Sequence, residues 1–472
     1  MSLSQKQPTV LPTAIEAAAW LFVLTLGILL VVLNVLGIRG ASLFCILFMV
    51  GLICAAWRNF DGGRHPCFLF LGLLFVFQCG RLSGFWTGFP DDPFMAGGTF
   101  PFSVSLLSQE ITLLLIAASA LFVYIPSRFT YQPIVFNAGP EQRWLRPLYV
   151  LLLLTLPFAA YKNYVYLSFV RSHGGYMAIY TNSEALLQSA GFLVRSIAIV
   201  GTTVLLLLYT FERRKWHLVA LLSLFFAVSS MDLLIGLRGK FFVQILLLWY
   251  IRNLKTGKKF NFVPLLSAAA AISLLAALIV GFRTEGKLNL VGPLGFMSSQ
   301  GVSMNVTELA VENRTLFGPR AGRYLLNEVL SAFSADETSQ SGDNFDADLS
   351  VFLNPESASE GYGTGSSYLA EAYLFGGIAG VIIASLLIGF CLSWLHRASR
   401  AWGGAVLLMT SLGWIIYMPR MGLISPFSQT VKSLVVVAIA AALTIPISVF
   451  LRLCSAGIAK SSANNLAVDS TS

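Results

Sequence analysis

The stretch Gly361-Tyr-Gly-Thr-Gly-Ser-Ser-Tyr-Leu-Ala-Glu371 marks the point where the longest polar segment of the chain returns to apolar sequence. Its alternating glycines permit backbone conformations and close approaches that other residues forbid. The apolar run that follows, residues 366–395, is long enough to span a bilayer. Glu371 lies about one and a half turns into that run. An ionisable group at such depth is costly, so Glu371 is a candidate functional residue.

The composition predicts a polytopic membrane protein. Of 472 residues, 56% are hydrophobic and only 11% charged, and the mean hydropathy is +0.75. Residues 1–13 are polar and a full-length span follows, so we expect no cleaved signal. The cysteines lie in or beside apolar runs without the clustering of a zinc site or a disulfide framework, and we interpret them as packing residues.

Windows of about 19 residues predict an all-α fold with twelve transmembrane spans. The third and eighth spans are short, so each is either a tilted helix extended by flanking residues or half of a re-entrant pair. The predicted spans are residues 15–37, 41–57, 67–80, 104–125, 146–162, 190–211, 218–236, 239–251, 261–282, 366–395, 404–418 and 430–451.

The distribution of Lys and Arg predicts the topology. With both termini in the cytoplasm, the compact connections 58–65, 127–146, 212–217, 252–259 and 396–402 are cytoplasmic and carry fourteen Lys or Arg. The 83-residue segment 283–365 holds five basic and eleven acidic residues, which favours the periplasmic side.

This topology divides the chain into four predicted parts. They are residues 1–282 with nine spans and outer loops at 81–103 and 161–189, residues 283–365 as a large periplasmic loop, residues 366–452 with three spans, and residues 453–472 as a cytoplasmic tail.

Several arginines fall at outer span ends, where the positive-inside bias disfavours them. They are Arg39, Arg81, Arg171, Arg238, Arg283 and Arg420, and Arg195 lies inside a span. Each could snorkel singly to headgroups. Gly236-Leu-Arg-Gly-Lys240 and Pro419-Arg-Met-Gly422, however, surround Arg238 and Arg420 with small or rigid residues that leave room for a ligand.

The large polar segment contains one predicted helix and one acidic tract. Leu325, Val329 and Phe333 have the spacing of one helical face, so part of the segment is expected to fold. The tract from Asp336 to Asp348 lacks the alternation and terminal Glu of an EF-hand, and we interpret it as a solvated surface.

Other chemistries lack their motifs. The chain has no phosphate-binding loop, no Rossmann fingerprint and no serine hydrolase elbow. Three of its four histidines are assigned to the cytoplasmic side, so only His173 can serve the outer face. We therefore predict no metal, no cofactor and no nucleic acid partner.

The outer carboxylates and arginines suit a pyrophosphate substrate. Arginine donates paired hydrogen bonds to phosphate oxygens and can stabilise the charge of a leaving pyrophosphate. The carboxylates near that level are Glu110, Asp232 and Glu371, although Asp232 could simply pair with Arg195. Tyrosines could stack on sugar faces or belong to an interfacial belt; they are Tyr161, Tyr164, Tyr166, Tyr176, Tyr362 and Tyr368.

The span plan, Gly236-Leu-Arg-Gly-Lys240 and the glycine-rich run at 361–371 resemble the O-antigen polymerases of the Wzy family. The resemblance implies a metal-independent glycosyltransferase with a GT-C-like fold related to O-antigen ligases, acting on undecaprenyl-pyrophosphate donors outside the cytoplasmic membrane. Arg238 matches the arginine of the Gly-x-Arg-Gly motif. The residues that match the glycine-rich motif are Gly363, Gly365, Ser366, Ser367 and Glu371.

The resemblance leads to the hypothesis of a polymerase in the bacterial inner membrane that transfers a growing glycan onto an incoming lipid-linked repeat unit. A ligase and a flippase are the alternatives, and a Wzz-type chain-length regulator is a possible partner. Glu371 and His173 are the candidate bases; Glu371 is favoured because it sits on a helix, but it could instead neutralise an arginine. The predicted substrate contacts are Arg171, Arg238, Arg283, Arg420, Tyr362, Gly363, Gly365, Ser366, Ser367 and Tyr368.

Overall fold

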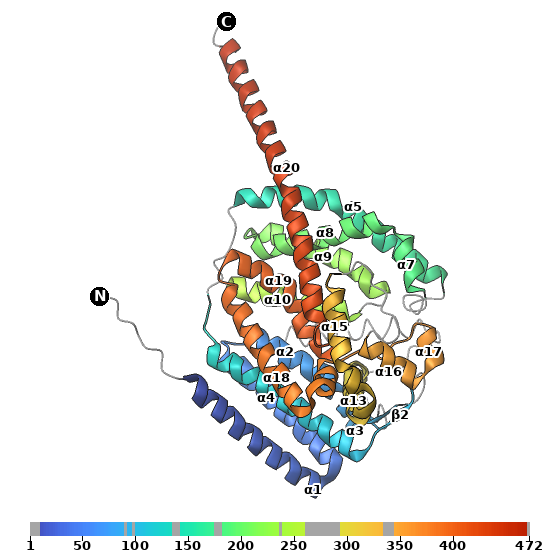
Figure 1. The fold of residues 1–472 in the computed structure, drawn as a ribbon. Coiled ribbons are helices and arrows are strands. Elements are labelled where there is room, and N and C mark those ends of the chain that lie inside the picture. Colours follow the sequence, from blue (N-terminus) through green and yellow to red (C-terminus); the bar gives the residue numbers. More distant parts are fainter. Residues whose placement is uncertain are drawn as a thin grey trace, which may run out of the picture. The chain divides into compact units, whose positions relative to one another are not determined.

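The computed structural model is built almost entirely of helices (Figure 1). It describes residues 10–88, 92–96, 100–134, 142–173, 182–235, 238–259, 293–333 and 344–469. The one described sheet is an antiparallel pair of short strands, β1 (Met95–Ala96) and β2 (Phe102–Ser103). The prediction of an all-α membrane protein is therefore confirmed.

The chain forms two compact units, and each is described by itself. The first unit comprises residues 1–137 and 238–430, and the second comprises residues 138–237 and 431–472. The long helix α20 (Ser425–Asp469) starts in the first unit, and its residues from Val431 onward belong to the second. Residues 453–469, predicted as a tail, are thus helical.

The first unit holds most of the helices. They are α1 (Val10–Asn59), α2 (Pro66–Leu74), α3 (Gly84–Thr87), α4 (Leu106–Thr130), α10 (Arg238–Thr256), α12 (Pro293–Gln300), α13 (Val302–Glu312), α14 (Arg314–Phe317), α15 (Ala321–Ser331), α16 (Phe345–Leu353), α17 (Pro355–Ser359), α18 (Tyr368–Ala398) and α19 (Trp402–Tyr417). Short turns of other helix types join them: η1 (Phe75–Cys79), η2 (Gly80–Ser83), η3 (Gly318–Arg320) and η4 (Met418–Arg420).

Two predicted spans at the start of the chain correspond to one helix with a break. Within α1, Gly37 takes φ of 65°, a left-handed conformation that L-residues with a side chain rarely adopt. The break separates the regions predicted as spans 15–37 and 41–57. Further along, α2, η1, η2 and α3 follow one another without a loop, and residues Pro66–Trp86 form one candidate span. The short third span is therefore a helix extended by flanking residues.

A second glycine break turns α18 into a helical hairpin. Gly377 has φ of 62°. Tyr368 and Ser385 both hydrogen-bond the Ser119 hydroxyl of α4, although a straight helix would separate them by about 25 Å. A Cβ on Gly380 would also collide with the Ala372 carbonyl oxygen. The 368–376 piece therefore lies alongside the 378–398 piece, and only the latter is a full-length spanning helix.

The described parts of the predicted loop, residues 293–333 and 344–365, pack into the first unit. A shared apolar cluster joins their helices to the hairpin of α18, through residues Val306, Leu309, Ala310, Phe317, Ala321, Tyr324, Phe345, Leu349, Ala370 and Leu374. At the other end of α13, Glu312 accepts hydrogen bonds from the backbone N–H and the hydroxyl of Ser105, the N-cap of α4. The described part of this segment is thus a layer of the helix bundle.

The structure corrects two of the expectations for this segment. The helix predicted from Leu325, Val329 and Phe333 is present as α15, but Phe333 is exposed, because the helix turns Ala321 and Tyr324 inward instead. Asp348, predicted to be solvated, is buried in α16, where Arg320 and Tyr324 donate to its carboxylate at 3.0 and 2.7 Å. A paired carboxylate can be buried at an acceptable cost.

The second unit contains α5 (Gln142–Ser172), α7 (Ser183–Ser189), α8 (Phe192–Phe211) and α9 (Lys215–Ile235). Because α5 continues to Ser172, the first part of the predicted outer loop 161–189 is helical. Helix α5 packs on α8 and α9: a Cβ on Gly201 would contact Thr155, and the Asn163 amide donates to the Val228 carbonyl at 3.0 Å. Small residues and interhelical hydrogen bonds are common means of packing membrane helices.

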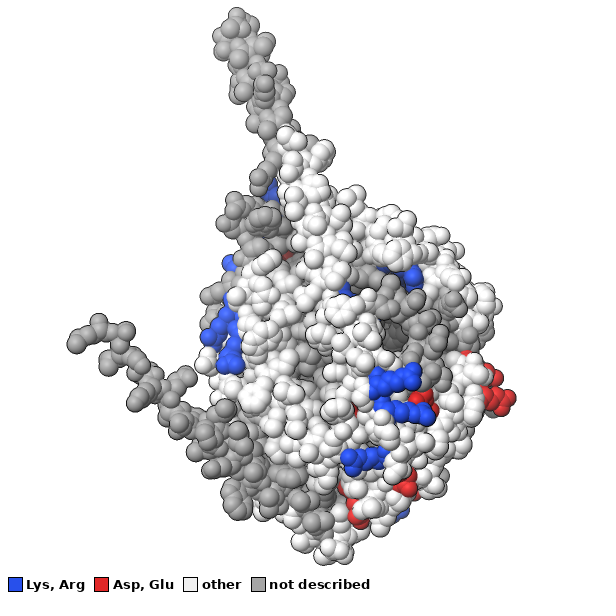
Figure 2. Space-filling view, in the orientation of Figure 1, with Lys and Arg blue, Asp and Glu red and all other residues white. Residues whose placement is uncertain are grey.

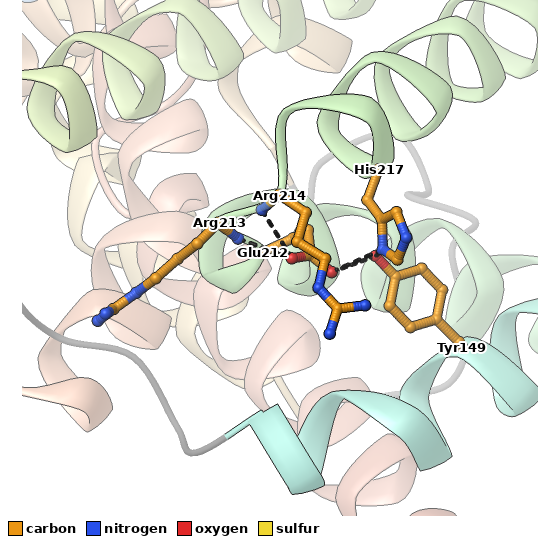
Figure 3. A network of polar contacts seen from close by, with 5 residues as sticks. All are labelled: Tyr149, Glu212, Arg213, Arg214 and His217. Carbon is orange, nitrogen blue, oxygen red and sulfur yellow. Dashed lines mark hydrogen bonds and ion pairs between the residues drawn. The ribbon is translucent and has the colours of Figure 1, made fainter.

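A polar network closes the turn between α8 and α9 (Figure 3). Glu212 accepts hydrogen bonds from the Tyr149 hydroxyl at 2.6 Å and from the backbone N–H groups of Arg213 and Arg214 at 2.8 and 2.9 Å. His217 Nδ1 lies 3.1 Å from the same carboxylate. Burial alone would raise the pKa of Glu212, but these hydrogen bonds lower that pKa to about 2.

The described residues contain eight helices that are long and apolar enough to cross a membrane, and a shorter apolar helix, Lys215–Ser230. Predicted span 261–282 lies outside the described residues. Predicted span 239–251 lies in α10, which is not one of the eight candidate spans because its two ends carry Arg and Lys residues. A membrane protein with several spans is thus confirmed, while the number twelve is not.

We predict that Glu212→Gln lowers the thermal stability of the detergent-solubilised protein at pH 7, by about 1 to 3 kcal/mol, because hydrogen bonds to a charged acceptor are lost. The folded-state pKa of Glu212 lies below its ordinary value, so its contribution is present above about pH 4.3 and is lost as pH falls toward 2. The difference in unfolding temperature between the two proteins should therefore shrink on acidification. An equal difference at pH 7 and pH 3 would contradict the assignment.

Candidate functional site

Glu371 lies in the first turn of α18 and is bound on two sides. Ser366, from the glycine-rich run, donates its hydroxyl to Glu371 Oε1 at 2.6 Å, and the backbone N–H of Leu423 donates to Oε2 at 2.7 Å. Gly365 has φ of 74°, so glycine at this position lets the chain turn before Ser366. The run at 361–371 therefore positions Glu371 against the loop between α19 and α20.

A second carboxylate, Glu328 of α15, binds the same loop. Its carboxylate accepts hydrogen bonds from the Ile424 backbone N–H at 3.0 Å and from the Ser425 hydroxyl. Burial raises the pKa of Glu328 above the ordinary carboxyl range, more than the hydrogen bonds from Ser425 and Ile424 lower it.

The two carboxylates converge on one glycine. A Cβ placed on Gly422 would collide with Glu328 Oε1 and would lie 2.7 Å from Glu371 Oε1. Like charges this close favour a state in which the pair shares a proton. We define Glu328, Glu371 and loop residues 421–425 as the carboxylate site.

Polar side chains from three elements line the side of the site next to Ser367. The Gln78 amide, from η1, donates to the Ser367 hydroxyl at 2.9 Å and to the Pro419 carbonyl at 3.0 Å. Thr307 of α13 lies within 3.4 Å of both Gln78 and Ser367. Ser367 also caps the start of α18 by accepting from the Leu369 N–H. These contacts fix the glycine-rich run, α13 and the α19–α20 loop to one another.

The carboxylate site lies below one end of the bundle. Ser119, the partner of Tyr368, is about 16 Å from the Thr130 end of α4 and about 20 Å from its Leu106 end. Glu371 lies one turn beyond Tyr368 toward the Leu106 end, since the 368–376 piece runs that way up to Gly377. The site therefore lies roughly 15 Å below the Leu106 end, which is the end predicted to face the periplasm.

Arg420 is the predicted arginine that lies beside this site. It ends η4, one residue before the loop, and its guanidinium donates to Gln300 Oε1 at 3.2 Å and lies 5.7 Å from the centre of the Phe77 ring. Arg81, by contrast, donates to the carbonyls of Pro93 and Met95 and so fastens the chain between α3 and β1. Its role in this structure is to hold the backbone.

The other predicted site residues of the first unit differ in how exposed their side chains are. Gly363 is exposed and Tyr362 is half-buried, beside Gly365 and Ser366. Tyr368 is 0% exposed, with its hydroxyl bonded to Ser119, so its ring packs between helices instead of facing a sugar. Arg238 begins α10 and its side chain lies outside the described part, as do Arg283 and Tyr176 entirely.

His173 and Arg171 belong to the second unit, at the end of α5, and both are exposed. His173 Nδ1 lies 3.0 Å from the Phe169 carbonyl and 2.9 Å from the Ser172 hydroxyl, and its ring stacks on Phe169. A carbonyl oxygen can only accept, so the contact with Phe169 is a hydrogen bond when Nδ1 carries a proton, which leaves Nε2 toward solvent-side partners in the neutral ring.

Sequence reasoning did not single out Glu328 or the arginines of the segment after α13. Arg314 lies 5.2 Å from the centre of the Tyr373 ring and next to Gly377, and Arg320 pairs with Asp348. Figure 2 shows charged side chains gathered over the α14–α17 segment on a face that is otherwise largely uncharged. In the sequence, the signal for Glu328 is its position one helical turn after Tyr324 in the predicted helix.

A metal site has no support among the described residues, since no three His, Cys, Asp or Glu side chains gather in a way that could hold an ion. The carboxylate site offers two acidic side chains, hydroxyls and backbone N–H groups. These groups can exchange a proton with a hydroxyl of a ligand. Arg420 precedes the loop in sequence, and its guanidinium contacts Gln300 and Phe77.

The fold and this site define an all-α polytopic membrane protein with a carboxylate pair in its helix bundle. Residues 16–452 match the sequence model of the family described as O-antigen polysaccharide polymerase Wzy. The chain therefore belongs to this family of polysaccharide polymerases, as its motifs predicted. Comparisons with curated proteins and with solved structures gave no match.

We predict that Gly422→Ala abolishes most polymer formation, because the added methyl would push Glu328 and Glu371 apart. Gly403→Ala is the matched control, since a Cβ at Gly403 meets no atom within 4 Å. Polymer length on gels and the amount of membrane-inserted protein should be measured for both variants. Normal polymer from Gly422→Ala would mean that the carboxylate pair has no role in the reaction.

Proposed function

We propose that this protein is a metal-independent, GT-C-like glycosyltransferase at the periplasmic face of the bacterial inner membrane. It transfers a growing glycan from undecaprenyl pyrophosphate onto the terminal sugar of an incoming lipid-linked repeat unit. The observation that carries the proposal is the carboxylate site, found in a chain that belongs to a family of polysaccharide polymerases.

The proposed reaction forms one glycosidic bond and breaks another. Glu371 accepts the proton of the acceptor hydroxyl as that oxygen attacks the anomeric carbon of the donor, and the bond from this carbon to pyrophosphate breaks. Each carboxylate oxygen has a further lone pair beyond the hydrogen bonds from Ser366 and Leu423, so Glu371 can still accept this proton. Glu328 can then share the proton with Glu371.

The leaving pyrophosphate gains negative charge, which nearby arginines would stabilise. Arg420 adjoins the carboxylate site, and Arg238, Arg171 and Arg283 are proposed to support it. The guanidinium of arginine donates two parallel hydrogen bonds to phosphate, whereas lysine offers a point charge. This is the physical basis for using arginines in place of a metal ion.

The first prediction concerns the base. Glu371→Gln should leave the protein inserted and able to bind lipid-linked donor, while polymer formation falls by about 100-fold or more, since the acceptor hydroxyl loses its proton acceptor. His173→Ala is the parallel variant. Near-normal elongation by Glu371→Gln with loss in His173→Ala would transfer the role to the histidine.

The second prediction concerns the arginines. Arg238→Lys keeps the charge but removes the paired donors, so polymer should become sharply shorter at unchanged protein level. Arg39→Lys is a suitable control, because Arg39 lies over the Phe85 ring and is not a proposed substrate contact. Wild-type polymer length from Arg238→Lys would remove Arg238 from the proposed site.

The third prediction distinguishes a polymerase from a ligase or a flippase. Deleting the gene should leave a single repeat unit on the lipid core, whereas bare core would indicate a ligase or a flippase.

A further experiment tests whether the reaction needs a metal ion. Purified protein with lipid-linked substrate should elongate the glycan in EDTA. Activity lost in EDTA and restored by magnesium or calcium would show that the arginines do not replace a metal.

A further inference from the structure

Helix α15 has an unusual distribution of side chains for a segment predicted to lie in water. Its inner face holds the buried Tyr324 together with Glu328 of the carboxylate site. Its opposite face holds Leu326 and Leu330, each 56% exposed, and Phe333, two residues after the helix ends, is 76% exposed. Leu326 and Leu330 are four residues apart and therefore lie on one face of the helix, with the exposed Arg323 one turn before Leu326 on that face and Phe333 just beyond the helix end.

Contacts on the inner face establish how deep α15 lies. Glu328 bonds Ile424 and Ser425, and Ser331 lies 2.9 Å from the Ser428 hydroxyl. Ser425 and Ser428 are in the first turn of α20, which is a candidate membrane span from Ser425 to Leu451. Helix α15 therefore packs beside the first turn of a spanning helix.

The preceding segment gives an independent measure. Arg314 of α14 lies against Gly377 and over the ring of Tyr373, both inside the apolar hairpin of α18. The shared apolar cluster likewise joins Phe317 and Tyr324 to Ala370 and Leu374 of that hairpin. The α14–α15 segment is thus packed against the apolar hairpin of α18, and its outer face is exposed at the side of the helix bundle.

From these contacts we infer that α15 lies in the outer half of the bilayer, with Leu326, Leu330 and Phe333 against the acyl chains of membrane lipids. The exposed Phe427 of α20, next to the Ser428 that contacts α15, continues the same apolar surface. An amphipathic helix with its apolar face toward acyl chains is stabilised by the hydrophobic effect at the membrane interface. The inference does not depend on the proposed function.

The consequence for the site is geometric. One helix, α15, separates the carboxylate site from lipid, because Glu328 and Leu330 lie on opposite faces of it. A lipid-anchored ligand in the outer leaflet is thus separated from Glu328 and Glu371 by the thickness of one helix. Segment 293–333 would then be a wall of the membrane-embedded site rather than a water-exposed loop.

Photo-crosslinking tests the inference without measuring activity. Benzoylphenylalanine is placed at Leu330 or Phe333 of the full-length protein, reconstituted in vesicles of phosphatidylethanolamine and phosphatidylglycerol that contain no polyprenyl carrier. The lipid-facing control is Leu387, an exposed residue within the spanning piece of α18, and the water-facing control is Glu360, which is exposed after α17. Irradiation and mass spectrometry then identify the adducts.

We expect phospholipid adducts at Leu330 and Phe333 in amounts similar to those at Leu387. We expect no phospholipid adduct at Glu360. Adducts at Leu330 as low as those at Glu360 would overturn the inference. A crosslinked dimer would instead identify a second copy as the occupant, and adducts that appear only after polyprenyl phosphate is added would identify a carrier groove; either result would also overturn it. Failure of the catalytic variants would leave these results unaffected.

Discussion

A carboxylate inside a helix bundle is tolerated only where donors replace the water it has lost, and the first unit is organised around that requirement. Glu371 and Glu328 come from α18 and α15, and the loop between α19 and α20 supplies the donors, through the N–H groups of Leu423 and Ile424 and the hydroxyl of Ser425. Three elements distant in sequence are thus joined by hydrogen bonds to two acidic groups. The same bonds leave room for no side chain at Gly422.

The second organising element is the break at Gly377. It folds the 368–376 piece back along the 378–398 piece, so that Tyr368 lies at the level of Ser385, and both bond Ser119. Without the break, Glu371 would lie near the outer tip of one long helix. With it, Glu371 is lowered into the bundle, next to a layer of helices from segment 293–331. A single left-handed glycine therefore sets the depth of the site.

These arrangements connect the site to a membrane-bound substrate. Arg420 follows directly from the end of α19 and stands one residue before the loop that holds both carboxylates. The inferred lipid-facing position of α15 brings the carboxylate site within one helix diameter of the outer leaflet, about 10 Å. Proton transfer, charge stabilisation and access for a lipid anchor would then meet in one region of the first unit. The proposed transfer between two lipid-linked substrates needs these three properties together.

Local sequence properties were enough to predict the class of the protein and most of its spanning helices, and they drew attention to the 361–371 run that holds Glu371. These features depend on local properties: apolar run length, glycine spacing and the cost of an acidic residue in an apolar helix. Family membership also followed from its motifs. The reversal at Gly377 was not predictable from hydropathy, since apolar residues continue on both sides of it. The role of Glu328 and the burial of Asp348 were decided only by tertiary structure, because a carboxylate in a polar segment looks solvated until the donors that bury it are brought together from elsewhere in the chain.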